Sequence, residues 1–262
     1  TRFLFNQAML AVERHNHIMH QLGLCGTVRT VEVAADLGVT DETIRRDLKV
    51  LARGDQLLRI HGGASSIKGK PKLQSFLERS NLNTEYKLAI AKNAISTVTP
   101  GRTYAFDSST TALALVSLLQ DSPYRVVTNS LAVIQSLVDY NRVELITTGG
   151  SFHHKTNTFV GGESINTLNH HRIHTAYISC IGYDFERGAS EGFEQQAIYK
   201  ERLVQLADEV ILLIDSSKIN SHSEYYFAST DQITRVITDS RIMPEIANSM
   251  RANGVNLTIA KS

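Results

Sequence analysis

The sequence predicts an α/β protein of two parts, an N-terminal three-helix winged helix-turn-helix domain and a doubly wound, mostly parallel α/β domain behind it. Two apolar helical patterns, separated by a Gly-Val pair in TVEVAADLGVTDETIRRDLKVL (residues 30–51), predict the first part. Short apolar runs that alternate with helical patterns from residue 76 onward predict the second. The chain has 262 residues, of which 42% are hydrophobic, so it can bury one sizeable core or two smaller ones.

Composition predicts where the domains begin and end. We expect the helical domain over residues 1–64, a linker over 65–75 and the second domain over 76–262. The linker segment reads SSIKGKPKLQS and contains Ser, Gly, Pro and three lysines, without apolar periodicity.

Whole-chain features narrow the class of protein only a little. The formal net charge of +1 excludes neither a nucleic-acid partner nor a small-molecule site, because the position of the charges matters more than their sum. No apolar run approaches the roughly 18 residues that a transmembrane helix needs, so we expect a cytoplasmic protein with no membrane partner. Cys25 and Cys180 lie in different halves of the chain, which favours buried thiols over a disulfide.

The helical domain opens with a pattern that predicts its first helix. The apolar positions of this helix are Met9, Leu10, Val12, Ile18, Met19 and Leu22. A shorter second helix, which ends at Gly38, has its apolar positions at Val31, Ala34, Ala35 and Leu37. Thr40 is placed to cap the third helix, and Asp41 and Glu42 suit the positive end of its dipole.

The third helix has an apolar face and a basic one. At about 100° per residue, Ile44, Leu48 and Leu51 fall on one face. The opposite face carries Glu42, Arg46, Lys49 and Arg53, with Arg45 at its flank. A basic helix face taken alone is as often merely solvated, so its meaning depends on the segments around it.

A wing pattern comes directly after the third helix. In GDQLLRIHGGASS (residues 54–66) a short strand-like run precedes the Gly62-Gly63 turn, and from Asp41 to Lys72 eight Lys or Arg residues stand against four acids, a local excess of +4. The combination predicts a DNA-binding surface, with base edges read by the helix and phosphates met by the other cations. The expected DNA contacts are Thr40, Thr43, Arg45, Arg46, Lys49, Arg53, Arg59 and His61. Arg45 and Arg46 are candidates for pairing with guanine, and which of them does so stays open.

The second domain alternates strand and helix patterns. We expect strands at 104–106, 125–127, 143–146, 176–181, 210–214 and 236–237, and a last one near Ile259. We expect helices at 85–97, 111–119, 131–139, 193–207 and 244–252.

Small polar residues come after the predicted strands. The strand ends run into DSSTT (107–111), TNS (128–130), TGG (148–150), GYD (182–184), DSSK (215–218) and TD (238–239). The carboxyl ends of parallel strands line one crevice, where ligands bind. DSSTT, at the start of a helix, could hold a phosphate, and Asp107 would suit sugar hydroxyls.

Each of these residues also has a plainer interpretation. A Ser/Thr-rich loop before a helix is more often only a cap, Lys218 can be a surface lysine, and Lys200 can pair with acids near it on its helix. Neither GxxxxGK[ST] nor an intact GxGxxG occurs, so we expect no nucleotide cofactor, and no cofactor of another kind is predicted. The histidines at 153–154, 170–171 and 174 have no acidic or thiol partner at ligand spacing, so no metal is expected.

Two sets of motifs resemble one known family. VTDETIRRDLKVLARGDQLLRIHGGA (39–64) is similar to the N-terminal signature of the DeoR family of bacterial transcription regulators. DSSTT, VTNS, the TGG segment, FVGG (159–162) and LLIDSSK (212–218) are similar to the effector domain of that family. The resemblance implies a second domain related to sugar-phosphate isomerases, a phosphorylated sugar as effector, operator DNA as partner, and a homo-oligomer, either dimer or tetramer. The effector contacts it implies are Asp107, Ser108, Ser109, Thr110, Thr111, Asn129, Gly149, Gly150, Lys200 and Lys218.

The predicted function is therefore that of a sequence-specific DNA-binding transcription regulator, without catalytic residues. We expect a repressor of a carbohydrate-utilisation operon, relieved by a phosphorylated sugar or sugar alcohol in the second domain. The alternative is a sugar-phosphate isomerase-type enzyme with an accessory helical domain, in which Asp107, Lys218 and Glu194 would do acid-base work, although they form no recognisable catalytic spacing. A third interpretation, a sugar-binding module that has lost DNA binding, is disfavoured by the intact TIRRDL face.

Overall fold

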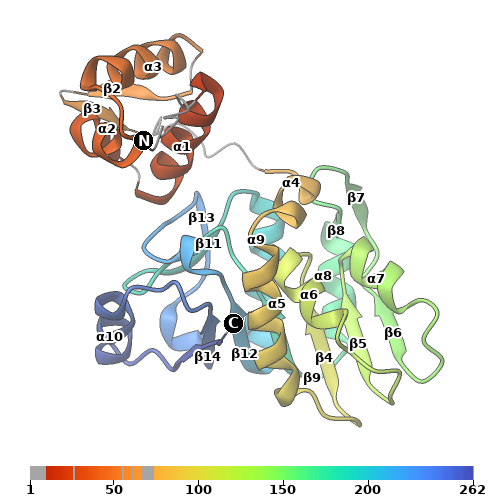
Figure 1. Ribbon diagram of the computed structural model, residues 1–262. Helices are drawn as coiled ribbons and strands as arrows, with labels where there is room; N and C mark the ends of the chain where they lie inside the picture. The colour runs from red at the N-terminus through yellow and green to blue at the C-terminus, as the bar shows by residue number, and fades with distance from the viewer. Residues whose placement is uncertain (1–9, 26, 55, 61, 66–73, 262) are drawn as a thin grey trace, which may run out of the picture. The chain divides into compact units, whose positions relative to one another are not determined.

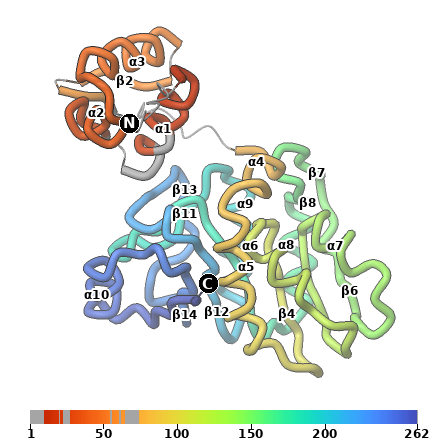
Figure 2. Tube along the Cα trace, viewed as in Figure 1, coloured from red at the N-terminus to blue at the C-terminus, as the bar shows by residue number. Residues whose placement is uncertain are grey.

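The computed structural model describes residues 10–25, 27–54, 56–60, 62–65 and 74–261. The chain divides into two compact units, residues 1–71 and 72–262, and each has its own core. Figure 1 labels most of the helices and strands of each unit, and Figure 2 traces the chain through them. Helices in the described ranges are all too short or too polar to cross a bilayer.

The first unit is a three-helix winged helix-turn-helix, as predicted. Its elements are α1 (Ala11–Cys25), β1 (Thr27–Arg29), α2 (Thr30–Leu37), α3 (Asp41–Arg53), β2 (Leu58–Ile60) and β3 (Gly63–Ser65). The strands form an antiparallel sheet in the order β1-β3-β2. A Cβ at Gly63 would lie 1.9 Å from the Val28 carbonyl oxygen, so the close approach of β1 to the wing requires glycine there.

Part of the predicted apolar face of this unit is wrong. Ile18 and Leu22 are buried in α1, but Leu10 and Val12 are each 68% exposed, and Met9 lies outside the described residues. In α2 the buried positions are Val33 and Ala34, whereas Val31 is 64% exposed. The core of this unit is small, so apolar residues on the outer sides of its helices face solvent.

The second unit is built on a seven-stranded sheet that is parallel throughout, in the order β15-β14-β12-β9-β4-β5-β6. Its strands are β4 (Thr103–Phe106), β5 (Arg125–Thr128), β6 (Glu144–Thr147), β9 (Ile173–Ile178), β12 (Ala207–Leu213), β14 (Arg235–Thr238) and β15 (Leu257–Ile259). The helices are α4 (Phe76–Asn81), α5 (Thr84–Ala94), α6 (Thr110–Val116), α7 (Leu131–Leu137), α8 (Gly162–Asn169), α9 (Glu194–Leu206) and α10 (Pro244–Ala252), with short 3-10 turns at Ile95–Thr97, Ser216–Lys218 and Thr230–Gln232.

Helices cover both faces of this sheet, so the doubly wound prediction is confirmed. Along β4, Tyr104 and Phe106 pack into a core with α5, α6 and α7, while Ala105 between them packs into a second core with α8, α9 and α10. The helices α5, α6 and α7 lie together over one side of the sheet in Figure 1.

Some second-unit elements differ from the prediction. The strand expected at 176–181 runs instead over Ile173–Ile178, because the Ser179 N–H turns away to donate to Asp107 Oδ2 at 2.9 Å. Two small antiparallel sheets were not predicted. They comprise β7 (Ser151–His153) with β8 (Thr158–Val160), and β10 (Gly182–Asp184), β11 (Gly188–Glu191) and β13 (Tyr225–Ala228). Strands this short and mixed in polarity carry little periodic signal.

Candidate functional site

Helix α3 presents its cations to solvent. Gly38 is left-handed, with φ of 62°, and ends α2, and Thr40 accepts a hydrogen bond from the Thr43 N–H at 3.3 Å, so the cap was correctly predicted. Ile44, Leu48 and Leu51 are buried, as expected for the inner face. The exposed side chains of α3 include Arg45, Arg46, Lys49 and Arg53.

The acid within TIRRDL is removed from this basic face. Asp47 is 5% exposed and accepts hydrogen bonds from Arg14 Nε at 2.7 Å and from Arg14 Nη2 at 3.2 Å, while His15 Nε2 lies 3.1 Å from its Oδ1. This buried pair ties α1 to α3 and leaves the outer face of α3 more basic than its sequence indicates.

The other predicted DNA contacts lie on the wing and at the start of α3. Arg59 is exposed on β2, opposite Ala64 of β3. Thr40 is exposed and Thr43 half-buried, and their hydroxyl oxygens are 2.9 Å apart. His61 lies outside the described residues.

The second unit has a pocket at the carboxyl ends of its central strands, and the pocket is partly open to solvent. From the predicted set, the structure brings Ser109, Thr110, Thr111 and Lys218 into its lining. The other lining residues are Gln74, Arg79, Leu82, Lys87, Ser179, Cys180, Ile181, Glu191 and Asp215. Asp107, Ser108, Asn129, Gly149, Gly150 and Lys200 do not line it.

Asp107 and Lys200 form a buried ionic cluster instead. Asp107 is 0% exposed, and its carboxylate accepts from the Ser109 N–H at 3.0 Å, the Ser179 N–H at 2.9 Å and Lys200 Nζ at 2.9 Å. Lys200 also donates to the Ser179 carbonyl at 2.7 Å and to Glu191. Burial alone would lower the pKa of Lys200, but the two carboxylates raise it above its usual value. The partners of Lys200 thus come from the ends of β4 and β9 and from β11, and not from its own helix.

Four further predicted residues support the strand ends. Ser108 accepts a hydrogen bond from Gln196 Nε2 at 2.6 Å, and Asn129 donates to the Phe159 carbonyl at 3.1 Å. Gly149 and Gly150 turn with φ of 65° and 104°. A Cβ at Gly150 would lie 2.5 Å from the Val160 carbonyl oxygen, so the close approach of β8 requires glycine there.

Ser109 lies both in the pocket lining and at the cap of α6. It lines the pocket, and its hydroxyl caps α6 by accepting from the Ala112 N–H at 3.1 Å. The cap fixes the position of the Ser109–Thr111 hydroxyls at the end of β4.

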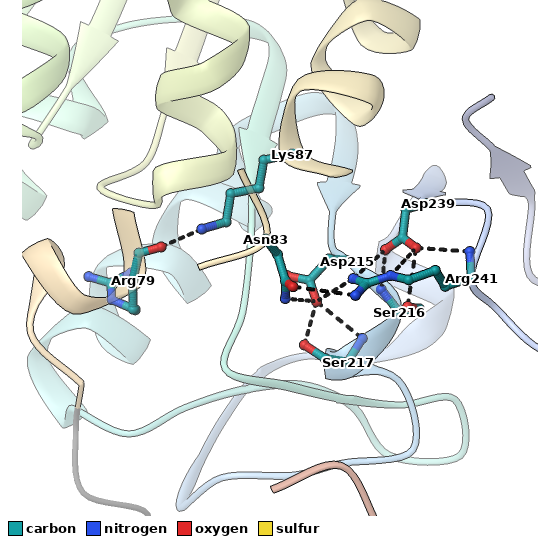
Figure 3. Close-up of polar contacts among 8 residues, drawn as sticks. All are labelled: Arg79, Asn83, Lys87, Asp215, Ser216, Ser217, Asp239 and Arg241. Atoms are coloured by element: carbon teal, nitrogen blue, oxygen red, sulfur yellow. Dashed lines mark hydrogen bonds and ion pairs between the residues drawn. The ribbon is translucent and has the colours of Figure 1, made fainter. Parts of the chain in front are cut away.

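Arg79 and Lys87 are the pocket cations that sequence reasoning missed. Lys87 is 7% exposed, and its ammonium donates to the Arg79 carbonyl, as Figure 3 shows. Burial lowers the pKa of Lys87 to about 8, which Asp215 opposes and the cations Lys218 and Arg79 assist. The spacing Ser75-x-x-Glu78 is that of a capping box, and both of its hydrogen bonds form at the start of α4, so this signal could have revealed the helix that carries Arg79.

A polar network holds α5, and therefore Lys87, against the strand ends. Asp215 accepts from Asn83 Nδ2 and from the Ser217 N–H, each at 3.1 Å, and Asp239 accepts from Arg241 Nε at 3.0 Å (Figure 3). The guanidinium carbon of Arg241 lies 3.4 Å from the centre of the Tyr86 ring. The network therefore joins the start of α5 to the ends of β12 and β14.

The charges of the pocket favour an anionic ligand. The pocket lining contains three cations, Arg79, Lys87 and Lys218. Of its two acids, Glu191 is paired with Lys200, and Asp215 accepts hydrogen bonds from Asn83 and Ser217. Burial raises the pKa of the Cys180 thiol to about 12, so it stays protonated and is a poor nucleophile. Within the described residues no three His, Cys, Asp or Glu side chains gather as metal ligands.

Comparison with known families matches both units. Residues 14–70 match the DeoR-like helix-turn-helix domain, and residues 82–240 match the DeoR C terminal sensor domain. A ribose 5-phosphate isomerase A from Methanocaldococcus jannaschii is similar at 17% identity over 52% of this chain and 55% of that chain, with a TM-score of 0.40.

Relatives match over nearly their whole length. An uncharacterized HTH-type transcriptional regulator of Bacillus subtilis is 34% identical over 250 residues, covering 95% of this chain and 97% of the relative. An L-fucose operon activator of Haemophilus influenzae is 33% identical, covering 88% and 93%, and a lactose phosphotransferase system repressor of Lactococcus lactis is 31% identical, covering 88% and 92%. These relatives are named as regulators and not as enzymes, which decides against the isomerase alternative. Since both domain families match in the expected order, the protein belongs to the DeoR family of DNA-binding transcription regulators.

Proposed function

We propose that this regulator is a repressor of a carbohydrate-utilisation operon and that a phosphorylated sugar or sugar alcohol relieves the repression. The names of relatives support the carbohydrate link, since they include a lactose phosphotransferase system repressor and an L-fucose operon activator. In the proposal, α3 and the wing bind the operator and the sensor-domain pocket binds the effector.

The observation that carries the effector class is the set of cations in the pocket. Lys87 and Lys218 share one lining with the hydroxyls of Ser109, Thr110 and Thr111. Charge-assisted bonds from cations and hydroxyls suit a phosphate monoester, which is close to a dianion at neutral pH. Asp107, Asn129, Lys200 and the Gly149–Gly150 turn then act by holding the strand ends in place.

The DNA-binding part of the proposal needs two copies of α3. A recognition helix reads one half-site in the major groove, so a symmetric operator needs a symmetric oligomer, a dimer or a tetramer. The effector relieves repression if it binds better to the arrangement of the oligomer that fits DNA poorly, and a coupling of about 1–3 kcal/mol is typical.

A panel of sugar phosphates, each beside its unphosphorylated parent, tests the effector class by thermal unfolding. We expect one phosphate to raise the unfolding midpoint, because a ligand at about 100 times its Kd adds about 2.7 kcal/mol of stability. The same compound should release the protein from operator DNA in an anisotropy titration. Lys218→Gln should weaken the shift, and Arg142→Gln, which removes an exposed cation outside the pocket lining, should not. Equal shifts from phosphate and parent would contradict the phosphate site.

The affinity for the phosphorylated effector should fall as pH rises through about 8. Lys87 loses its charge there, since burial lowers its pKa to about 8, while the phosphate stays dianionic. Binding above this pH must restore the proton, so calorimetry in buffers of different ionisation enthalpy should show proton uptake. We expect roughly 30-fold weaker binding near pH 9.5, because each pH unit above a pKa of about 8 adds a tenfold cost of restoring the proton. Lys87→Gln should bind the effector weakly both below about pH 8 and near pH 9.5. If that variant shows the pH profile of the wild type, the pH effect comes from another group.

A further inference from the structure

We propose that Arg79 binds the phosphate group of the effector and that this contact fixes α4, the first helix after the segment joining the two units. The inference rests on the proposed function, because it needs an anion in the sensor-domain pocket. It adds a ligand contact and a point at which ligand binding acts on the first helix of the second unit.

The guanidinium of Arg79 has donors that no acceptor satisfies within the described part of the chain. Its Nε and Nη2 atoms are shielded from solvent and have no hydrogen-bond partner among the described residues. Burial lowers the pKa of Arg79, and the carboxylates of Glu191 and Asp107 oppose that shift, so the group remains a cation. Buried charged donors without acceptors are costly, and an arriving anion removes that cost.

The carboxylates near Arg79 are already paired with Lys200. Lys200 lies against both Asp107 and Glu191, at 2.9 Å from the Asp107 oxygen. Arg79 also lines the pocket beside Lys87, whose ammonium contacts the backbone carbonyl of Arg79 itself (Figure 3). A planar guanidinium pairs with two phosphate oxygens at once, which makes a phosphate a better match than a single hydroxyl.

Within the described residues, α4 is held by half-buried side chains and by backbone hydrogen bonds. None of its residues is buried, and Leu77 is 71% exposed. The Phe76 N–H donates to the Lys155 carbonyl in the β7–β8 turn at 2.8 Å, and Lys87 holds the carbonyl of Arg79. A phosphate on the Arg79 side chain therefore adds a strong attachment to this helix, and helices of six residues are marginal without tertiary contacts.

Helix α4 is the first helix of the second unit, so a ligand contact there acts where that unit begins. Ser75, which caps α4, lies three residues after Lys72, where the second unit begins. An anion that fixes α4 therefore fixes the point at which the joining segment enters the sensor domain. Ligand binding can then stabilise the start of the second unit locally through one side chain, without a rearrangement of the parallel sheet.

Amide hydrogen exchange of the full chain, with inorganic phosphate as the probe, tests this inference. Thermal unfolding in the same buffers reports whether phosphate binds, and chloride at equal ionic strength controls for salt. We expect saturating phosphate to slow exchange of the α4 amides about tenfold, equivalent to about 1.4 kcal/mol. In Arg79→Gln, phosphate should still raise the unfolding midpoint through Lys87 and Lys218 but should no longer slow exchange in α4. Leu77→Ala, on the exposed side of the same helix, should respond like the wild type.

The outcomes separate this inference from the proposed function. A wild-type midpoint that rises while exchange in α4 stays unchanged would overturn the role of α4 and leave the effector pocket standing. Equal protection of α4 in Arg79→Gln would show that another residue anchors the helix, which overturns the role of Arg79. A wild-type midpoint that does not respond to phosphate at all would remove the anion site, and the inference and the proposed effector class would fail together.

Discussion

Replacing Lys200 with methionine should destabilise the sensor domain by roughly 3–5 kcal/mol, the usual cost of removing one partner from a buried ion pair. The side chain of Lys200 is almost fully buried between Asp107 and Glu191. Methionine has a similar length but leaves two carboxylates facing each other without a counter-charge. Glu191 and Asp107 must then take up protons or water, and the ends of β4, β9 and β11 lose their common anchor.

Urea unfolding of the full chain measures this loss, provided that the two units are followed by separate probes. Lys92→Met, which removes an exposed lysine from α5, is the matched control and should change stability little. The triple variant with Lys200→Met, Asp107→Asn and Glu191→Gln should recover much of the stability, because no unpaired charge stays buried. If the Lys200→Met protein instead has normal stability but does not respond to effector, then Lys200 contacts the effector.

The fold could be predicted where one short segment determines its own structure. The α3 helix carries its cap, its apolar stripe and its basic face within Thr40–Arg53, and the structure reproduces all three. The parallel strands were recognisable because buried strands read as apolar runs between helices. The sheet of β10, β11 and β13 could not be predicted, since β13 reaches β11 only after α9, β12 and the DSSK loop have intervened.

The position of the pocket at the strand ends was predictable, but the pairing of its charges was not. DSSTT and DSSK indicated where strands end, and Ser109, Thr110, Thr111 and Lys218 do line the pocket. Which charges neutralise each other depends on distances in space, and the sequence contains none of these. Asp107 and Lys200 stand far apart in the chain yet form an ion pair, and no motif in the sequence singled out Arg79.

Replacing both Arg45 and Arg46 with alanine should weaken operator binding by roughly 2–6 kcal/mol, if each contributes the roughly 1–3 kcal/mol of a contact that discriminates one base. Both side chains are exposed, so thermal unfolding of the variant should match the wild type. Effector affinity should also be unchanged, because the pocket lies wholly within the second unit. Arg172→Ala, on an exposed arginine of the sensor domain, controls for the loss of charge.

The single variants then separate base reading from phosphate contact, the point that the sequence leaves open. Replacing an arginine that pairs with guanine should weaken binding most on the wild-type operator. On an operator in which that base is changed, the same replacement should weaken binding little. Replacing an arginine that contacts phosphate should weaken binding to all DNA sequences alike. It should also reduce the salt dependence of binding by about one charge. Arg53, near the end of α3, should behave in the second way. If the double variant retains full operator affinity and an unchanged salt slope, α3 is not the recognition helix, and the DNA-binding surface must lie elsewhere on the first unit.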